Sequence, residues 1–167
     1  MTTIHAYTAT QKTVDSASKK DWKGGRAAAV NIIPSTTGAA KATALVIPEL
    51  KCKLDGLALR VPVPDGSITD LVCVLSREAS RDEVNEAFRS ASGEERWSGI
   101  VQYTDDAIVS SDIVGNPHSL IVDGQSTMAN GRMVKVLGWY DNEWGYSCRL
   151  ADVVERVAQR IPAAASA

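Results

Sequence analysis

A histidine near the start of the chain has a side chain suited to proton transfer. The segment MTTIHAYT places His5 between strand-favouring residues and a long irregular stretch. An imidazole exchanges a proton close to neutral pH, but a histidine at a strand end is more often a structural hydrogen-bonding group. Strands that run into loops commonly display catalytic side chains, so we take His5 as the candidate catalytic residue and rank the only other histidine, His118, below it.

Two further segments carry groups that suit an anion. In NIIPSTTGAAKA, a helix is expected to begin near Thr37 and Gly38, where free backbone N–H groups and the helix dipole favour negative charge. The glycine would allow a ligand close to the backbone. Simple capping of the helix by a hydroxyl explains the pattern equally well. Arg60 ends an apolar run, and a guanidinium either stays solvated there or binds phosphate or carboxylate with two hydrogen bonds.

The segment WYDNEWGYS gathers aromatic residues, an amide and a glycine at the start of the last expected helix. A packed corner with an Asp or Asn helix cap would account for it. Asn142 could equally present its amide to a flat ligand that itself carries an amide.

These candidates need secondary structure to hold them. The pattern predicts a strand over residues 1–8, an ordered loop over 9–30, and a helix from about residue 37 to Pro48. Ser80 and Glu83 form a capping box for a helix that covers one face of a sheet, and a last amphipathic helix carries an apolar stripe. That stripe consists of Leu150, Val153, Val154, Val157 and Ile161.

The remaining segments predict strands. One of them is apolar from Leu71 to Leu75, which predicts burial on both faces, with Cys73 in the core. Asn130 and Gly131 predict a type I′ hairpin turn. The irregular alternation of helices and strands indicates an α+β fold with a mostly antiparallel or mixed sheet covered on one face by helices. The predicted strand segments are LDGLALRVPV, SITDLVCVLS, GIVQYT, AIVSSDIV, HSLIVDG and RMVKVLGWY.

Composition narrows the class of protein. The 167 residues suffice for a single domain, and 18 basic against 20 acidic residues, without a block of like charge, argue against a nucleic-acid partner. The sequence shows neither a membrane span nor a signal peptide, which predicts a cytoplasmic protein. Three widely spaced cysteines predict reduced structural thiols and no metal site. There is no GxGxxG fingerprint of a dinucleotide-binding fold.

Five segments together resemble one enzyme family. TTIHAYT, NIIPSTTGAAKA, LALRVPV, IVSSDIVG and WYDNEWGYS occur in the order and spacing of the C-terminal catalytic domain of phosphorylating glyceraldehyde-3-phosphate dehydrogenase. The resemblance runs from about Thr2 to about Ile161. It implies oxidation of glyceraldehyde 3-phosphate by NAD and inorganic phosphate, through a thioester on an active-site cysteine, to 1,3-bisphosphoglycerate. It also implies a homotetramer in the parent enzyme.

The resemblance assigns roles to individual residues. His5 resembles the base that activates the cysteine thiol. Thr8 and Arg60 resemble the pair that holds the C3 phosphate, and Thr37 with Gly38 resemble the site of the attacking phosphate. Asn142, with Tyr146 close by, resembles the residue that binds the nicotinamide carboxamide. The stretch after Thr8 resembles the S-shaped loop that packs between subunits.

The chain also departs from the family pattern. The serine-cysteine-threonine-threonine-asparagine motif of the nucleophile does not occur in it. We therefore expect residues 1–167 to be a single catalytic and substrate-binding domain, inactive alone, whose upstream Rossmann NAD-binding domain is absent from this chain. Lys23 stands where many relatives have an arginine near the phosphate sites, which loses the bidentate fork. Ser16 and Ala17 replace a leucine and proline common in NAD-specific bacterial relatives, so the resemblance leaves NADP open as well.

Two alternatives stay open at this point. The parent could act on erythrose 4-phosphate, although relatives of that kind diverge at the helix start that is intact here as Thr37 and Gly38. The chain could instead be a non-catalytic assembly module that buries its sheet face against other copies, since a large exposed apolar surface favours association.

Overall fold

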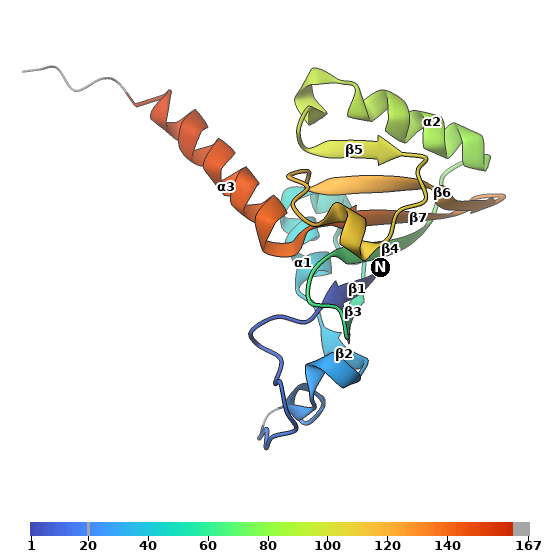
Figure 1. Ribbon diagram of the computed structural model, residues 1–167. Coiled ribbons are helices and arrows are strands. Elements are labelled where there is room, and N and C mark those ends of the chain that lie inside the picture. The colour runs from blue at the N-terminus through green and yellow to red at the C-terminus, as the bar shows by residue number, and fades with distance from the viewer. Residues whose placement is uncertain (20, 162–167) are drawn as a thin grey trace, which may run out of the picture.

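One seven-stranded sheet organises the chain, and the computed structural model describes residues 1–19 and 21–161. The strand order is β2-β3-β1-β4-β7-β6-β5, with β1 parallel to β3, β5 parallel to β6 and the other neighbours antiparallel (Figure 1). The predicted mixed sheet is confirmed. The strands are β1 (Thr2–Ala6), β2 (Ile33–Thr36), β3 (Leu57–Val61), β4 (Ser67–Val74), β5 (Val101–Thr104), β6 (Leu120–Asn130) and β7 (Met133–Tyr140).

Within the described residues three α-helices accompany the sheet: α1 (Ala39–Val46), α2 (Arg81–Ser92) and α3 (Asn142–Ala158). The predicted capping box opens α2, because Ser80 accepts a hydrogen bond from the Glu83 N–H and the Glu83 carboxylate accepts one from the Ser80 N–H. The helix lies along β5 and β6 (Figure 1), and Phe88 lines a cavity there together with residues of β4 and β7. The α+β class with a helix over one sheet face is therefore confirmed.

The two faces of the sheet differ sharply. Directly paired residues point to the same side, so the register places His5, Arg60 and Tyr140 on the face that α2 covers. On the opposite face Val72 and Val74 are 49% and 70% exposed. The predicted burial of both faces between Leu71 and Leu75 is therefore wrong at Val72 and Val74. Cys73, on the covered face, is only half-buried.

Two further segments, one predicted as a strand and one as a type I′ turn, have a different local structure from the one predicted. The segment AIVSSDIV is not a strand but contains the 3-10 helix η5 (Ser110–Ile113), and the Asp112 carboxylate accepts the Val109 N–H at 2.7 Å. The hairpin between β6 and β7 forms as expected, but only Gly131 of its two central residues has a positive φ, at +59°. Glycine at the first central position fits type II′ rather than the predicted type I′.

The described residues of the long segment between β1 and β2 form an ordered loop, as predicted. It contains two 3-10 turns, η1 (Lys23–Gly25) and η2 (Ala28–Val30). Asp15 accepts the Ala27 N–H at 2.8 Å and pairs with the Arg26 guanidinium, and the Ser16 N–H donates to the Gly25 carbonyl. These bonds fold the loop back on itself and bring η1 beside the start of β2.

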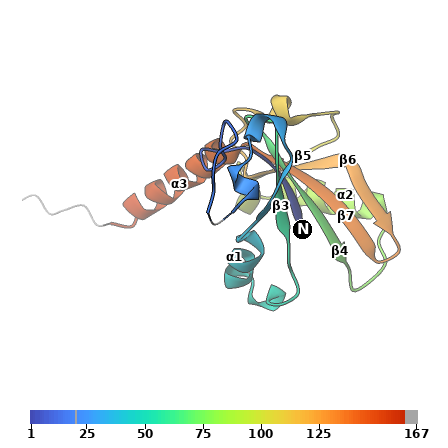
Figure 2. The ribbon, with the colours of Figure 1, turned by 90° about the horizontal axis from the view of Figure 1, so that it is seen from below.

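The last helix projects away from the sheet (Figures 1 and 2). Its first turn is anchored where Gly145 is buried against the backbone of His118. The predicted amphipathic helix is confirmed, but its apolar stripe from Leu150 to Ile161 faces outward, with side chains 51–65% exposed. No helix in the described residues has the length and apolar character needed to cross a bilayer.

Candidate functional site

The candidate site begins where the parallel strands β1 and β3 place His5 and Arg60 directly opposite each other. Arg60 Nη1 lies 2.7 Å from His5 Nδ1 and donates to the Ala6 carbonyl oxygen at 3.1 Å. The Tyr140 ring meets the imidazole edge-on, with 5.9 Å between ring centroids. The structure thus brings together two residues that the sequence analysis selected separately.

The surroundings of His5 favour the neutral imidazole. Partial burial lowers its pKa below the ordinary 6.5, and the nearby Arg60 cation lowers it further, while the contact with the Ala6 carbonyl and the charge of Glu143 raise it. The Ala6 oxygen also lies 2.7 Å from Nδ1. While the guanidinium donates to Nδ1, that nitrogen accepts and the ring hydrogen lies on Nε2. If Arg60 turns away, Nδ1 can donate to Ala6 and leave Nε2 free as a base.

Arg60 has N–H groups that no acceptor in the described structure uses. Its hydrogen bonds in the described structure all use Nη1, and its Nε is buried without a partner. A buried guanidinium N–H without an acceptor is costly, and an anion would supply one. Thr8 lies two residues beyond the end of β1, where its hydroxyl donates to Gln11 Oε1 at 3.1 Å. No hydrogen bond joins Thr8 to Arg60 within the described residues.

Asn142, the first residue of α3, is tied to the turn before β4. Its Oδ1 accepts a hydrogen bond from the Ser67 hydroxyl, and its Nδ2 donates to Asp65 Oδ1 at 3.2 Å. Ser67 also accepts the Ala6 N–H at 3.1 Å, one residue after His5. The expected helix cap, Asp141, turns its carboxylate instead to the Gly115 N–H. Asn142 is thus connected to the His5 strand through one buried hydroxyl.

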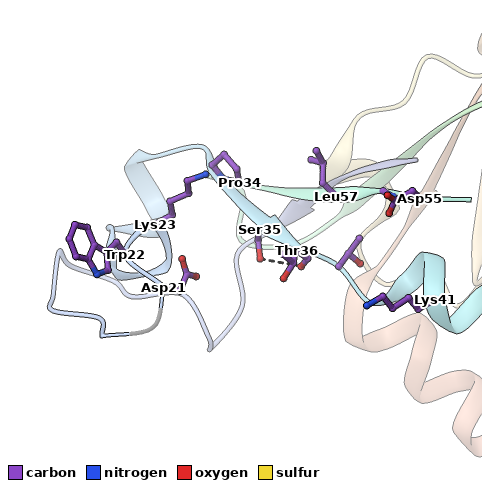
Figure 3. A pocket seen from close by; sticks show the side chains of 11 residues that line it. Asp21, Trp22, Lys23, Pro34, Ser35, Thr36, Lys41, Asp55 and Leu57 are labelled. Atoms are coloured by element: carbon purple, nitrogen blue, oxygen red, sulfur yellow. Dashed lines mark hydrogen bonds between the residues drawn. The ribbon is translucent and has the colours of Figure 1, made fainter.

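A second group of polar residues lies at the other end of β2. A cavity of about 880 Å³ is lined by Lys23 of η1, by Lys41 of α1 and by the hydroxyl residues between them (Figure 3). Gly38 opens α1, and nothing lies within 4 Å of the position of an added Cβ, so a ligand could approach this backbone closely. Thr37 lines the cavity and its Oγ1 accepts the Ala39 N–H at 3.2 Å.

The two groups occupy separate places. Ile33 pairs with Arg60 and Thr36 pairs with Leu57, so Thr37 lies four residues along β2 from the level of Arg60. At a strand rise of about 3.3 Å per residue this corresponds to roughly 13 Å. The structure therefore joins His5 with Arg60, and Lys23 with Thr37, but does not merge the two pairs.

Sequence reasoning missed Ser67 and Asp65. Ser67 is 1% exposed, and the turn before it contains Gly66 with φ +82°, a conformation that glycine adopts readily. The dipeptide Asp65-Gly66 was an available turn signal, but it did not indicate contact with a residue 77 positions away. Tyr146, the other residue expected at the cofactor, is 70% exposed one turn after Asn142.

The described residues contain no group of three or more potential metal ligands close enough to hold an ion. All three cysteines are free thiols, with Cys52 exposed and Cys73 and Cys148 half-buried. None of them lies among the residues that contact His5.

Comparisons with known proteins identify a family. The family model described as "Glyceraldehyde 3-phosphate dehydrogenase, C-terminal domain" matches residues 1–142. Glyceraldehyde-3-phosphate dehydrogenase of Streptomyces coelicolor is 59% identical over 162 residues, which cover 96% of this chain and 48% of that protein. The Phaffia rhodozyma protein of that name is 54% identical over 95% of this chain and 47% of its own length, and glyceraldehyde-3-phosphate dehydrogenase 2 of Bacillus subtilis is 53% identical over 96% and 47%.

This chain spans about half the length of the curated relatives that it matches. The family model covers most of its residues, including every candidate site residue except Tyr146. The chain therefore belongs to the glyceraldehyde 3-phosphate dehydrogenase C-terminal domain family.

Proposed function

We propose that this chain is the catalytic and substrate-binding half of a phosphorylating glyceraldehyde-3-phosphate dehydrogenase, and that an upstream half supplies the nucleophilic cysteine and most of the dinucleotide site. The observation that carries the proposal is the direct contact between His5 and Arg60, with Asn142 linked to the same strand end through Ser67. These residues place a base, an anion-binding cation and an amide in one site.

In this proposal His5 holds the proton of the thiol. Burial and Arg60 keep the pKa of the imidazole low, so the ring is neutral at physiological pH and can accept that proton as the sulfur attacks the aldehyde carbon. When Arg60 turns to the C3 phosphate, Nδ1 is left donating to the Ala6 carbonyl and Nε2 becomes the accepting nitrogen. The imidazolium so formed returns its proton as the thioester is cleaved.

The two phosphate groups have separate places in the proposal. Arg60, one residue before the end of β3, and Thr8, two residues past the end of β1, bind the C3 phosphate of the aldehyde. Thr37 and Gly38 bind the inorganic phosphate that cleaves the thioester to the acyl phosphate, with Lys23 adding charge from the loop side of the same cavity. The separation of roughly 13 Å along β2 supports two anion sites rather than one.

The proposed cofactor is NAD, which accepts the hydride when bound, and its nicotinamide carboxamide would meet the half-buried amide of Asn142, with Tyr146 on the next turn. Tolerance of NADP belongs to the same proposal, because the groups that distinguish the two lie with the adenine end. We assign the protein to the cytoplasm, with no nucleic-acid or membrane partner.

A chimera tests the function. This chain replaces the matching half of the Streptomyces coelicolor relative, and NADH formation is followed with glyceraldehyde 3-phosphate, NAD and phosphate. We expect turnover by the chimera and none by the chain alone. A chimera that prefers erythrose 4-phosphate would overturn the substrate assignment, and turnover by the isolated chain would overturn the claim that the nucleophile lies elsewhere.

The apolar sheet face supports a second, non-exclusive role in assembly. Val72, Val74, Met128 and Met133 are 49–70% exposed on the face opposite α2. These apolar side chains surround Lys135, which pairs with Asp70 at 2.8 Å. Exposed apolar surface around one neutralised ion pair favours burial against another copy, which supports a homo-oligomer, a tetramer in the full-length parent. Sedimentation of the isolated chain at micromolar concentration should show an oligomer, and a clean monomer would count against this role.

A further inference from the structure

We propose that Ser67 and Asp65 are positioning residues that fix which way the Asn142 amide points, and that Ser67 thereby couples this amide to the strand carrying His5. The inference rests on the proposed function, because it concerns how Asn142 would meet a nicotinamide carboxamide. It concerns residues that neither the sequence analysis nor the family comparison assigns to the site.

The direction of the hydrogen bonds in this network is fixed at one end by a group that can only donate. The backbone N–H of Ala6 donates to Ser67 Oγ at 3.1 Å. The Ser67 hydroxyl hydrogen is therefore free for a different partner, and it points to Asn142. Because that hydrogen needs an acceptor, Asn142 presents its Oδ1 and not its NH2 group to Ser67.

The other end of the network is a group that can only accept. The Asp65 carboxylate takes the Asn142 Nδ2 hydrogen at 3.2 Å and the Gly66 N–H at 2.7 Å, both on Oδ1. A flipped amide would turn its oxygen toward this carboxylate, which is electrostatically unfavourable. The constraints from Ala6 and from Asp65 agree, so the amide has one orientation.

This orientation determines what Asn142 offers a ligand. One lone pair of Oδ1 and one hydrogen of Nδ2 are already used, and the second lone pair and second hydrogen remain. A primary carboxamide is the complementary partner, because it has one carbonyl acceptor and an NH2 donor. A ligand with a methyl ketone in place of the carboxamide could use only the Nδ2 hydrogen.

Ser67 is suited to this role because its hydroxyl is shielded from bulk water. The residue is 1% exposed and pairs with Tyr140 in the sheet, next to the end of β1. Removal of its hydroxyl would leave the Ala6 N–H without an acceptor and Oδ1 of Asn142 without a donor. The amide would then be held only by Asp65.

The experiment uses the Streptomyces coelicolor chimera and two cofactors, NAD and its 3-acetylpyridine analogue, in which a methyl ketone replaces the carboxamide. For Ser67→Ala we expect kcat/KM for NAD to fall about tenfold and that for the analogue to fall less than threefold. Asp65→Ala should compress the preference for NAD in the same way, whereas Asp65→Asn, which can still present an acceptor oxygen, should retain it. Thr127→Val, which removes another buried hydroxyl in β6, is the matched control and should leave the ratio unchanged.

The outcomes separate this inference from the proposed function. An inactive wild-type chimera would count against the proposed function alone, and the Asn142 orientation is then read in the isolated ¹⁵N-labelled chain, where Asp65→Ala should shift the Asn142 side-chain amide resonances far more than Asp65→Asn does. An active chimera whose NAD preference is the same in wild type, Ser67→Ala and Asp65→Ala would overturn the positioning role. Because Asp65 lies in a turn, its pair of variants keeps the test valid even where Ser67→Ala does not fold.

Discussion

The polar end of β1 and the outward stripe of α3 differ in how much of their surface this chain satisfies by itself. At the strand end His5, Arg60, Ser67 and Asn142 hold one another through hydrogen bonds to side chains and backbone. Along α3, apolar side chains from Leu150 onward are more than half exposed. The comparison teaches that positioning of the site is built into this chain, whereas coverage of its apolar surfaces is not.

The start of α1 lies between these two extremes. It carries polar groups, as the strand end does, yet Gly38 has open space beside it and Thr37 makes a single local hydrogen bond. A site that is polar and unfilled differs from one whose groups already satisfy each other. The three regions should therefore respond differently to substitution.

The largest effect is expected at His5. In the chimera, His5→Asn removes the proposed base and should lower kcat by about a hundred- to ten-thousand-fold with little change in KM for the aldehyde. His118→Asn is the matched control, because the His118 side chain bonds to Asn116 and makes no hydrogen bond to the candidate site within the described residues; it should leave kcat within about twofold. If His5→Asn kept the kcat of the wild-type chimera, His5 would not be the catalytic base.

The apolar sheet face should contribute more to self-association of the chain than the apolar stripe of α3. The sheet face is broad, with residues exposed on β4, β6 and β7, whereas the α3 stripe is narrow. We expect Val72→Glu combined with Val74→Lys to weaken oligomer formation of the isolated chain at least tenfold in sedimentation experiments. The same pair of charges in α3, Val153→Glu with Val157→Lys, is spaced i,i+4 with the acid first, which suits a helix, and should have the smaller effect. If the α3 variant weakened oligomer formation more than the sheet-face variant, α3 would be the surface through which the copies associate.

The two anion regions should respond to different substrates. In the chimera, Thr37→Val should raise KM for inorganic phosphate several-fold to tenfold, since a hydrogen bond to a charged group is lost, and leave KM for the aldehyde nearly unchanged. Thr8→Val should do the opposite, and each variant serves as the control for the other. Equal effects of either variant on both constants would mean that the roughly 13 Å separation along β2 does not divide the substrates.

The sequence was informative where local patterns decide structure. The capping box at Ser80 predicted the start of α2, and the Thr37-Gly38 pair predicted the start of α1. Residue type and position selected His5 and Arg60, the resemblance gave them roles, and the structure places them opposite each other across a parallel pair. Such features depend on neighbours in sequence or on short motifs, which is why they could be read directly.

Contacts across the sheet could not be read in the same way. Ser67 is a small residue in a strand, and its importance comes from Ala6 and Asn142, which lie 61 and 75 positions away. The burial of Val72 was mispredicted because periodicity shows that a strand is apolar on both faces but not whether this chain covers both. AIVSSDIV was misread because the Asp112 side chain competes with strand pairing.

The smallest effect concerns stability against pH, and it probes the strand end without any partner domain. The pKa of His5 is lowered by burial and by Arg60, and that of His118 is lowered by burial and by Arg149. A histidine whose pKa is lower in the folded state binds protons more readily when unfolded. It therefore leaves the free energy of unfolding unchanged with pH above 6.5 and destabilises the fold as the pH falls below that value.

The urea midpoint of the isolated chain should therefore drop between pH 7 and pH 5.5. This window lies above the titration of carboxylates such as Asp15 and Glu83, whose pKa values are lowered. His5→Gln should flatten this slope in part, and Arg60→Gln should flatten it less, because that variant removes one cause of the lowered pKa and leaves burial in place. A midpoint that rises on acidification in this window would show that the fold stabilises the charged His5 ring. A ring that is already protonated could not accept the proton of the thiol, which would contradict its proposed role as the base.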